Sequence, residues 1–200
     1  MSTELVQTGV KFPDATIQTS AAVGKAYPLK LMNTDTQHHV YRRNAAVMSD
    51  GTVRSWGVGT SWQHGDGFLG YRPLPSNVGF PPGFVGAQEV YYSQEYSGIV
   101  LDKNGQIWTW GLNNYGWCGN GTTNPVKVPY NASTNTSNSI YGKTVSKVIM
   151  QNGIEDINTF MVLCTDGTVH ACGYNGYGQC GNGNTTDQYY FVRCGTLTGV

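Results

Sequence analysis

The stretch GTVHACGYNGYGQCGNG at residues 167–183 decides the fold, because the chain contains it in three versions. Residues 51–67 read GTVRSWGVGTSWQHGDG, and residues 105–121 read GQIWTWGLNNYGWCGNG. Aligned without a gap, the copies share glycine in four columns: Gly51/Gly105/Gly167, Gly57/Gly111/Gly173, Gly65/Gly119/Gly181 and Gly67/Gly121/Gly183. The later two copies also share Asn113/Asn175, Tyr115/Tyr177 and Cys118/Cys180. Internal repetition of this kind predicts a fold built from stacked repeats.

Each copy has the pattern of a β-hairpin followed by a tight loop. A short apolar run precedes the turn and a second β-prone run follows it, as at 160–163 and 169–172. The turn pairs are Asp50-Gly51, Asn104-Gly105 and Asp166-Gly167. Such a pair predicts a hairpin, and we expect a type I′ turn, in which both central residues have positive φ. A further short strand is expected to end near Val78, Val128 and Val192. Sheets this small must stack on their neighbours.

These residues resemble the repeats of the regulator of chromosome condensation family. In that family an Asp-Gly hairpin leads to Trp-Gly, then to Asn, and then to Gly-Gln-Leu-Gly-x-Gly. Trp110-Gly111 and the GQCGNG of residues 178–183 match this pattern. The resemblance covers residues 27–200 and implies a β-propeller. The expected fold class is all-β: a partial, three-repeat β-propeller-like module preceded by a short extended N-terminal segment.

The sequence departs from the family pattern at a few positions. Cysteine stands in place of the usual leucine at 118 and 180, and Cys172 replaces the tryptophan. In the first copy Trp62 stands where the later copies have glycine, which leaves a different path open for that loop. The five cysteines, at 118, 164, 172, 180 and 194, are odd in number and scattered. This pattern favours reduced, buried thiols over a disulfide framework.

We divide the chain into residues 1–26, a fibre or attachment segment, and residues 27–200, the three repeats. The first segment contains VKFPDATIQTSAA at 10–22, which resembles a motif of bacteriophage tail-fibre proteins that reads roughly Ile-x-Phe-Pro-Asp-Gly-Thr-x-Gln-Thr. The predicted attachment or oligomerisation residues are Phe12, Pro13, Asp14, Ile17 and Gln18. The resemblance implies a virion protein. An ordinary N-terminal hairpin or tail is the alternative.

The charge of the chain argues against polyanionic partners. Charged residues make up 12% of the chain and the formal net charge is zero, so nothing favours binding to phosphate backbones. Nuclear members of the resembled family bind chromatin and a small GTPase, and this charge gives no support for carrying that role over.

No apolar run approaches the roughly 20 residues that span a bilayer. We therefore expect neither nucleic-acid binding nor membrane insertion.

The sequence contains no strong catalytic motif. Asp50 and Asp166 fall in the turn column and are expected to form turns. Nucleophile elbows, phosphate-binding loops and metalloprotease patterns are missing from the sequence. We therefore expect no enzyme activity, no cofactor and no metal. A zinc site among cysteines 164, 172 and 180, and a carboxylate pair that cleaves polysaccharides, remain less favoured alternatives.

Aromatic and amide side chains in the loops indicate a binding surface. Flat aromatic faces beside Asn and Thr suit recognition of sugars. The receptor-contact candidates are Trp117, Tyr174, Tyr115, Tyr177, Asn131 and Asn135. Trp117 has no aromatic counterpart in the other copies, which makes it the best candidate for surface contact, whereas Tyr115 and Tyr177 also suit packing between repeats. The polar run 131–139 looks too hydrophilic to pack, so we expect a solvent-facing loop.

Three repeats are fewer than the roughly 4–8 blades that close a propeller. We therefore expect a homo-oligomer, a trimer or dimer, or a permanent assembly partner. The leading hypothesis is a non-enzymatic tail-fibre or baseplate protein of a bacteriophage, made in the host cytoplasm and located in the virion. Its partners would be other virion tail proteins and a host-surface glycan or protein. A structural adaptor within the virion and a cellular propeller scaffold are the alternatives.

Overall fold

The structure, a computed structural model, describes residues 26–33, 43–93, 96–151 and 159–197. Within these ranges the chain forms three four-stranded antiparallel sheets, here called blades. Blade 1 contains β1 (Pro28–Asn33), β2 (Arg43–Met48), β3 (Val53–Gly57) and β4 (Arg72–Asn77). Blade 2 contains β5 (Ala87–Tyr92), β6 (Ser97–Asp102), β7 (Ile107–Gly111) and β8 (Val126–Asn131). Blade 3 contains β9 (Val145–Gln151), β10 (Thr159–Cys164), β11 (Val169–Gly173) and β12 (Gln188–Arg193).

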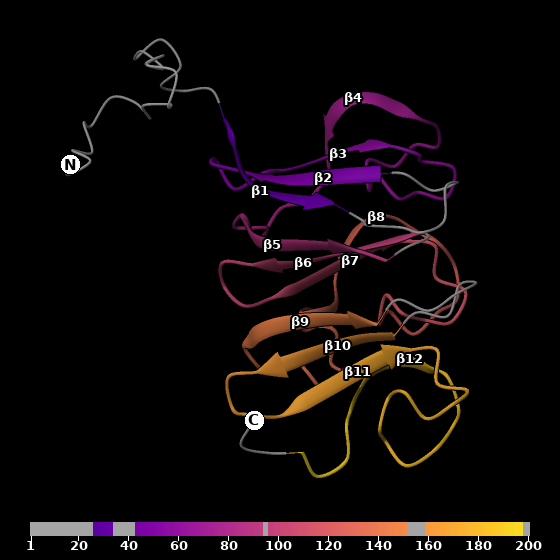
Figure 1. The fold of residues 1–200 in the computed structure, drawn as a ribbon. Coiled ribbons are helices and arrows are strands. Elements are labelled where there is room, and N and C mark those ends of the chain that lie inside the picture. Colours follow the sequence, from indigo (N-terminus) through magenta and orange to yellow (C-terminus); the bar gives the residue numbers. More distant parts are fainter. Residues whose placement is uncertain (1–25, 34–42, 94–95, 152–158, 198–200) are drawn as a thin grey trace, which may run out of the picture.

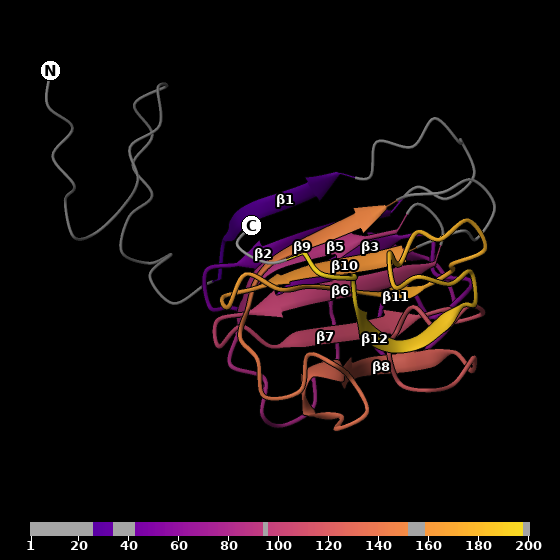
Figure 2. The same cartoon turned by 90° about the horizontal axis from the view of Figure 1, so that it is seen from below.

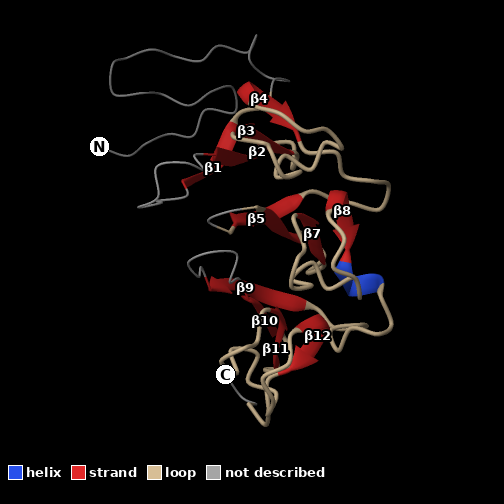
Figure 3. Cartoon of the chain, turned by 90° about the vertical axis from the view of Figure 1, so that its right-hand side faces the viewer, coloured by secondary structure: helices blue, strands red, loops and turns tan. Residues whose placement is uncertain are grey.

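The blades are stacked in sequence order as three successive layers (Figure 1). Each blade is a meander in which consecutive strands are neighbours. Figures 2 and 3 show the first strands β1, β5 and β9 along one side of the stack and the last strands β8 and β12 along the other. The prediction of an all-β, partial propeller is confirmed. The extended N-terminal segment that we expected lies outside the described residues.

The three hairpins lie where the sequence predicted them, but their turn type is different. Val47 pairs with Val53, and Leu163 pairs with Val169. Gly51 has a φ of 84°, whereas Trp62 is the only non-glycine residue with positive φ in the described ranges. The prediction of type I′ turns was therefore wrong. The Gly51 amide donates to the Met48 carbonyl oxygen, so only the residue after the tight turn needs the left-handed conformation that glycine adopts readily.

Consecutive blades meet at a joint that is built in the same way twice. The Trp110 indole Nε1 donates to the carbonyl oxygen of Gln63 at 2.8 Å. The Cys172 thiol donates to the carbonyl oxygen of Trp117 at 3.1 Å. Trp110 and Cys172 occupy one repeat column, and Gln63 and Trp117 occupy another. The joint is therefore a repeated interface, in which one blade supplies the donor and the blade before it supplies the acceptor.

A backbone hydrogen bond strengthens each joint. The Gly67 amide donates to the Lys127 carbonyl oxygen at 3.1 Å, and the Gly121 amide donates to the Tyr189 carbonyl oxygen at 2.9 Å. A Cβ atom at Gly121 would lie 2.1 Å from the hydroxyl oxygen of Tyr190. Glycine in this column therefore lets the loop of one blade approach the last strand of the next blade.

The hydrophobic core lies in the joints. The cluster between blades 1 and 2 includes Val47, Val53, Val90, Val100 and Trp110. The cluster between blades 2 and 3 includes Leu101, Ile107, Val148, Phe160 and Phe191. On the far side of blade 3 lies a small cluster of Ala171, Cys180 and Cys194. The two large clusters thus lie where neighbouring blades cover each other, as expected for stacked repeats.

The polar run 131–139 packs in part between blades 2 and 3: Ala132, Ser133 and Asn138 are buried, whereas Thr134, Thr136 and Ser137 are exposed. The prediction of a solvent-facing loop was therefore wrong for the buried part of the run. It includes the short 3₁₀ helix η2 (Ala132–Thr134), which Figure 3 shows beside β8. The buried Asn138 side chain donates to the Gly119 carbonyl oxygen at 2.9 Å and accepts from the Phe191 amide at 2.7 Å. Polar side chains can be buried in this way when each finds a hydrogen-bond partner.

Candidate functional site

A buried asparagine organises the glycine loop of blade 2. The Asn113 side-chain oxygen accepts from the Cys118 amide at 2.9 Å. Its Nδ2 donates to the carbonyl oxygens of Thr122 at 2.8 Å and Asn124 at 3.2 Å. One carboxamide therefore closes both ends of the loop, because it carries donors and an acceptor together.

Asn175 does the same in blade 3. Its side-chain oxygen accepts from the Cys180 amide at 2.8 Å, and its Nδ2 donates to the carbonyl oxygens of Asn184 at 3.0 Å and Thr186 at 2.9 Å. Sequence reasoning noted the shared column and assigned it no role. The signal was present, because an identical amide residue recurred inside a glycine-rich loop, where backbone groups need side-chain partners.

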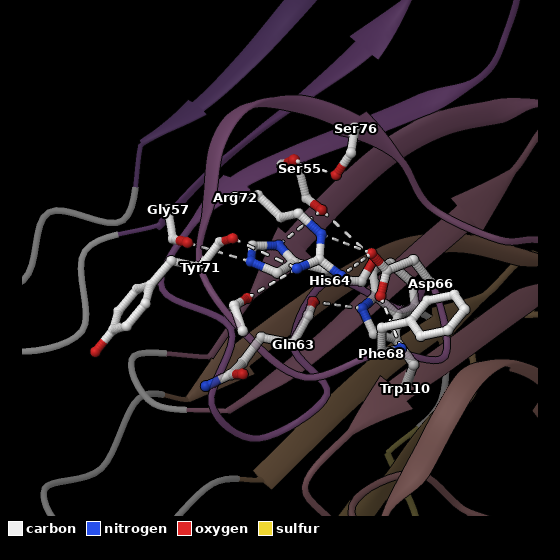
Figure 4. Close-up of polar contacts among 11 residues, drawn as sticks. Ser55, Gly57, Gln63, His64, Asp66, Phe68, Tyr71, Arg72, Ser76 and Trp110 are labelled. Carbon is white, nitrogen blue, oxygen red and sulfur yellow. Dashed lines mark hydrogen bonds and ion pairs between the residues drawn. The ribbon is translucent and has the colours of Figure 1, made fainter.

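Blade 1 fills the same space with a histidine. Gly59 stands in the asparagine column, and a Cβ atom there would lie 2.2 Å from the His64 ring. The His64 Nδ1 pairs with the Ser55 hydroxyl at 3.0 Å, and Nε2 pairs with the Gly57 carbonyl oxygen at 3.3 Å (Figure 4). Compared with blades 2 and 3, blade 1 thus has glycine in place of asparagine and histidine in place of cysteine. The two differences belong together, because the histidine ring needs the space that the glycine leaves.

The different path that Trp62 left open for this loop is not taken. Trp62 has a φ of 66°, close to the 76° of Gly116 and the 79° of Gly178 in the same column. The Lys127 ammonium lies 4.7 Å from the centroid of the Trp62 ring. This cation–π contact stabilises a backbone conformation that is unfavourable for a bulky residue.

An ion pair closes the blade 1 loop beside His64. Arg72 donates to Oδ2 of Asp66 through Nε at 2.9 Å and Nη2 at 2.6 Å (Figure 4). The two side chains are mostly buried, with 20% and 15% of their surfaces exposed. Since His64 is fully buried and Asp66 is fully engaged, this group holds the loop together and presents no reactive side chain to solvent.

Three tyrosines gather where the glycine loops of blades 2 and 3 meet. The rings of Tyr115 and Tyr174 are 5.2 Å apart and nearly perpendicular, and those of Tyr174 and Tyr177 are 6.0 Å apart. Tyr115 and Tyr174 are half-buried, whereas Tyr177 is 81% exposed. Burial, with the neighbouring Tyr177, raises the pKa of the Tyr174 phenol, which therefore stays a neutral donor. We call these three residues the tyrosine cluster.

The prediction that Trp117 contacts a receptor was wrong. Its side chain is fully buried, and its indole Nε1 donates to the Leu112 carbonyl oxygen. Its ring lies 5.9 Å from that of Tyr115, beneath the tyrosine cluster. Trp117 is the only tryptophan in its column because it fills the core between blades 2 and 3, not because it faces solvent.

The two candidate asparagines hold the 131–139 segment in shape. Asn131 caps η2 by accepting from the Ser133 amide at 3.1 Å, and Asn135 donates to the Tyr130 hydroxyl at 2.8 Å. Both side chains are half-buried and hydrogen-bonded within the loop. The structure thus brings together Tyr115, Tyr174 and Tyr177 and leaves Asn131 and Asn135 in structural roles. The predicted attachment residues, Phe12, Pro13, Asp14, Ile17 and Gln18, lie outside the described residues.

The cysteines have the environment of core residues. All five are buried and unpaired. Burial raises the pKa of the Cys180 thiol to about 12, which disfavours the thiolate that metals and electrophiles require. In the part of the chain that the structure describes, no three His, Cys, Asp or Glu side chains gather as a metal site. None of the helices found there has the length and apolar character to cross a membrane.

We expect stability to fall as the pH falls from about 6.5 towards 4. Burial, with Lys143 and Arg193 nearby, lowers the pKa of His170 to about 4, and burial also lowers the pKa of His64. Below pH 6.5 the histidine is protonated in the unfolded chain but stays neutral in the folded chain, so a fall in pH favours unfolding. The loss from His170 should be about 1–2 kcal/mol. Melting temperatures at pH 7.5 and pH 5 measure it.

The variant His170→Asn serves as the comparison for this experiment. It removes the titrating group beside Ser139 and Thr168. We expect its melting temperature to change less between the two pH values than that of the native chain, whatever its absolute stability. Equal changes in the two proteins would contradict the assignment.

Taken together, the stacked meanders and their repeated joints define an open, partial β-propeller. Residues 104–148 match the family model of the Regulator of chromosome condensation (RCC1) repeat. This match spans β7, β8 and the beginning of β9. This part of the chain therefore has the sequence of an RCC1 repeat.

Two curated relatives share part of the sequence of this chain. The chain is 31% identical over 140 residues to the human E3 ubiquitin-protein ligase HERC2, which involves 70% of this chain and 3% of that protein. It is 28% identical over 130 residues to the Protein RCC2 homolog of Danio rerio, which involves 58% of this chain and 23% of that protein. The chain thus corresponds to a small part of either relative.

Solved structures share the fold. Human WBSCR16 aligns with a TM-score of 0.58 and 22% identity over 76% of this chain and 37% of that one. Prp20p of Saccharomyces cerevisiae, described together with its binding to Gsp1p and histones, aligns with a TM-score of 0.62 and 15% identity over 76% of this chain and 36% of that one. At these identities the likeness shows a shared fold.

Proposed function

We propose that this protein is a non-enzymatic recognition module that binds a glycan on a cell surface through the tyrosine cluster. The observation that carries the proposal is the arrangement of Tyr115, Tyr174 and Tyr177. Their rings are in contact, and the exposed fraction rises from the half-buried Tyr115 and Tyr174 to 81% at Tyr177. Aromatic rings supply flat apolar faces and phenol groups that suit stacking on sugars with hydrogen bonds at the edge.

The context that we propose is the tail fibre or baseplate of a bacteriophage, with other virion proteins as partners. The support is the VKFPDATIQTSAA segment at residues 10–22, which resembles tail-fibre sequences and lies outside the described residues. A virion carries several copies of such a protein, and weak contacts to a host surface then add up through multivalency.

A cellular propeller scaffold is the second candidate, and the similarity to HERC2 and to the RCC2 homolog favours it. In that role the blades bind a protein, as Prp20p binds Gsp1p and histones. The zero net charge of this chain gives no electrostatic support for a histone or nucleic-acid partner.

A binding screen on the purified chain tests the proposal. We expect binding to at least one bacterial surface polysaccharide on a glycan panel, and we expect Tyr177→Ala to weaken it about tenfold, the equivalent of one stacking contact. Tyr141→Ala is the matched control, because Tyr141 is an exposed tyrosine (54%) that is not one of the three cluster residues. Failure to bind any polysaccharide, or binding that Tyr177→Ala leaves unchanged, would refute it. Detection of the chain in purified virions separates the two candidates.

A further inference from the structure

Each joint has two complementary halves. The blade that comes first offers a trailing face: the carbonyl of Gln63 or Trp117 and the glycine of the loop column, Gly67 or Gly121. The blade that follows offers a leading face: a donor side chain, a carbonyl from its last strand, and an apolar side chain that covers the glycine. The leading-face groups are Trp110, Lys127 and Val128 in blade 2, and Cys172, Tyr189 and Tyr190 in blade 3.

Blade 3 has a trailing face that no described blade covers. Gly183 has a φ of 89°, close to the 83° of Gly67 and the 79° of Gly121. An added Cβ atom at Gly183 meets nothing within 4 Å, whereas one at Gly67 lies 3.6 Å from Val128. No donor among the described residues reaches the carbonyl oxygen of Gln179, which is equivalent to the acceptors in both joints. The loop is therefore shaped for a partner that is missing from the three-blade stack.

The sheet residues of blade 3 also indicate that this face lacks a covering blade. Leu163 and Val169 of blade 3 are half-buried, whereas Leu101 and Ile107, in the same columns of blade 2, are fully buried. These residues pair in the same register at each hairpin. The trailing face of blade 3 is thus an apolar surface of the same kind as the buried joints.

Blade 1 has a leading face that no described blade covers. Leu31 is 67% exposed, although its counterparts by register, Val90 and Val148, are 0% and 2% exposed. Leu74, in the column of Val128, is 75% exposed. Trp56 stands in the donor column of Trp110 and Cys172 and is only half-buried. Large exposed apolar surfaces of this kind usually mark interaction sites.

We propose that two copies of this chain associate head to tail, with the leading face of blade 1 of each copy docked on the trailing face of blade 3 of the other. In this joint the Trp56 indole donates to the Gln179 carbonyl, Leu74 covers Gly183, and the Gly183 amide donates to the Pro73 carbonyl. Two such joints close a ring of six blades, which is within the range of known propellers. A head-to-tail contact that closes in this way leaves neither face exposed.

One contact of the internal joints is not available between copies. The Ala87 amide donates to the Gly51 carbonyl at 2.8 Å, and the Val145 amide donates to the Gly105 carbonyl at 2.9 Å. Pro28 occupies the equivalent position in β1 by register, and proline has no amide hydrogen. The joint between copies therefore lacks one hydrogen bond, and we expect a reversible dimer.

Light scattering coupled to size exclusion tests the proposal on the full chain. Between about 1 and 100 μM, a range that brackets micromolar dissociation constants, the mass is expected to rise from 21.7 kDa to twice that value. Leu74→Asp blocks a leading face, and Gly183→Asn places a side chain where Leu74 must lie. Each variant alone should stay at the mass of one chain. Tyr141→Asp is the control and should dimerise like the native chain, because Tyr141 is exposed and belongs to neither face.

An equimolar mixture of the two blocked variants makes the test specific. Each supplies the intact half that the other lacks, so the mixture should recover the mass of two chains joined through one joint. Far-ultraviolet circular dichroism and melting curves establish that both variants are folded. A native chain that stays at 21.7 kDa over the whole range, a trimer, a mass that grows without limit, or a mixture that stays at one chain would each overturn the proposal.

Discussion

Replacing Trp110 with alanine lowers the free energy of unfolding by about 4 kcal/mol, in the range of fully buried tryptophans. The side chain is 0% exposed and makes edge-to-face contacts with Phe80 at 5.8 Å and Tyr92 at 5.6 Å. Its ring also lies against Gly98, where a Cβ atom would be 2.4 Å away. The substitution leaves a cavity between blades 1 and 2 and removes the donor to the Gln63 carbonyl.

Trp56→Ala is the matched control, because the repeat places the same residue type in the same column of blade 1. Trp56 is half-buried, and among the described residues its side chain makes no hydrogen bond comparable to that of Trp110 with Gln63. We expect it to cost less than half as much as Trp110→Ala. Thermal melts should show a loss of about 8–16 °C for Trp110→Ala, at 2–4 °C per kcal/mol for a domain of this size. Both substitutions belong in a Leu74→Asp background, which keeps the chain from dimerising. Equal losses would contradict the view that the joint stabilises the fold.

The framework of the fold could be predicted from the sequence, because it depends on local chemistry. Gly51 and its counterparts mark hairpin ends, and the flanking apolar runs mark strands; these signals act within a few residues. The repetition then gave the blade order. The turn type was missed, because an Asp-Gly pair suits more than one hairpin geometry and Asp50 keeps an ordinary φ.

The side chains at the joints could not be predicted in the same way. Trp117 looked like a surface residue because no other copy has an aromatic residue there. What repeats in that column is the backbone carbonyl that accepts from the next blade, at Gln63 and at Trp117. The side chain is free to differ between copies, and in blade 2 it fills the core. Differences between repeats therefore do not distinguish a surface from a core.

The 131–139 segment was misjudged for a related reason. Its composition gave the low hydrophobicity of an exposed loop. Asn138, however, pairs with the Ala132 carbonyl of its own segment and with two other segments, through the Gly119 carbonyl and the Phe191 amide. Such pairing depends on tertiary arrangement, which composition does not contain. The tyrosine cluster could be predicted in part. Its members were candidates from the sequence, but only the structure shows that the rings of Tyr115 and Tyr174 are 5.2 Å apart.

Replacing Asn175 with alanine is expected to destabilise the chain by about 3 kcal/mol. The Cys180 amide and the carbonyls of Asn184 and Thr186 would lose their partner, and leaving buried polar groups unsatisfied costs about 1–3 kcal/mol each, with partial relief from water. Asn114→Ala is the matched control, because Asn114 is an exposed asparagine in the glycine loop of blade 2. Denaturant unfolding should show a change below about 0.5 kcal/mol for this control.

The variant Asn175→Asp separates the role of hydrogen bonding from that of side-chain volume. An aspartate keeps the shape and still accepts from the Cys180 amide, but its second oxygen would face the carbonyls of Asn184 and Thr186, which also carry negative partial charge. At pH 7 this variant should be at least as unstable as Asn175→Ala. Protonation restores one donor, so its deficit relative to the native chain should shrink as the pH falls towards 5. If Asn175→Asp is as stable as the native chain at pH 7, the carboxamide does not organise the loop through its donors.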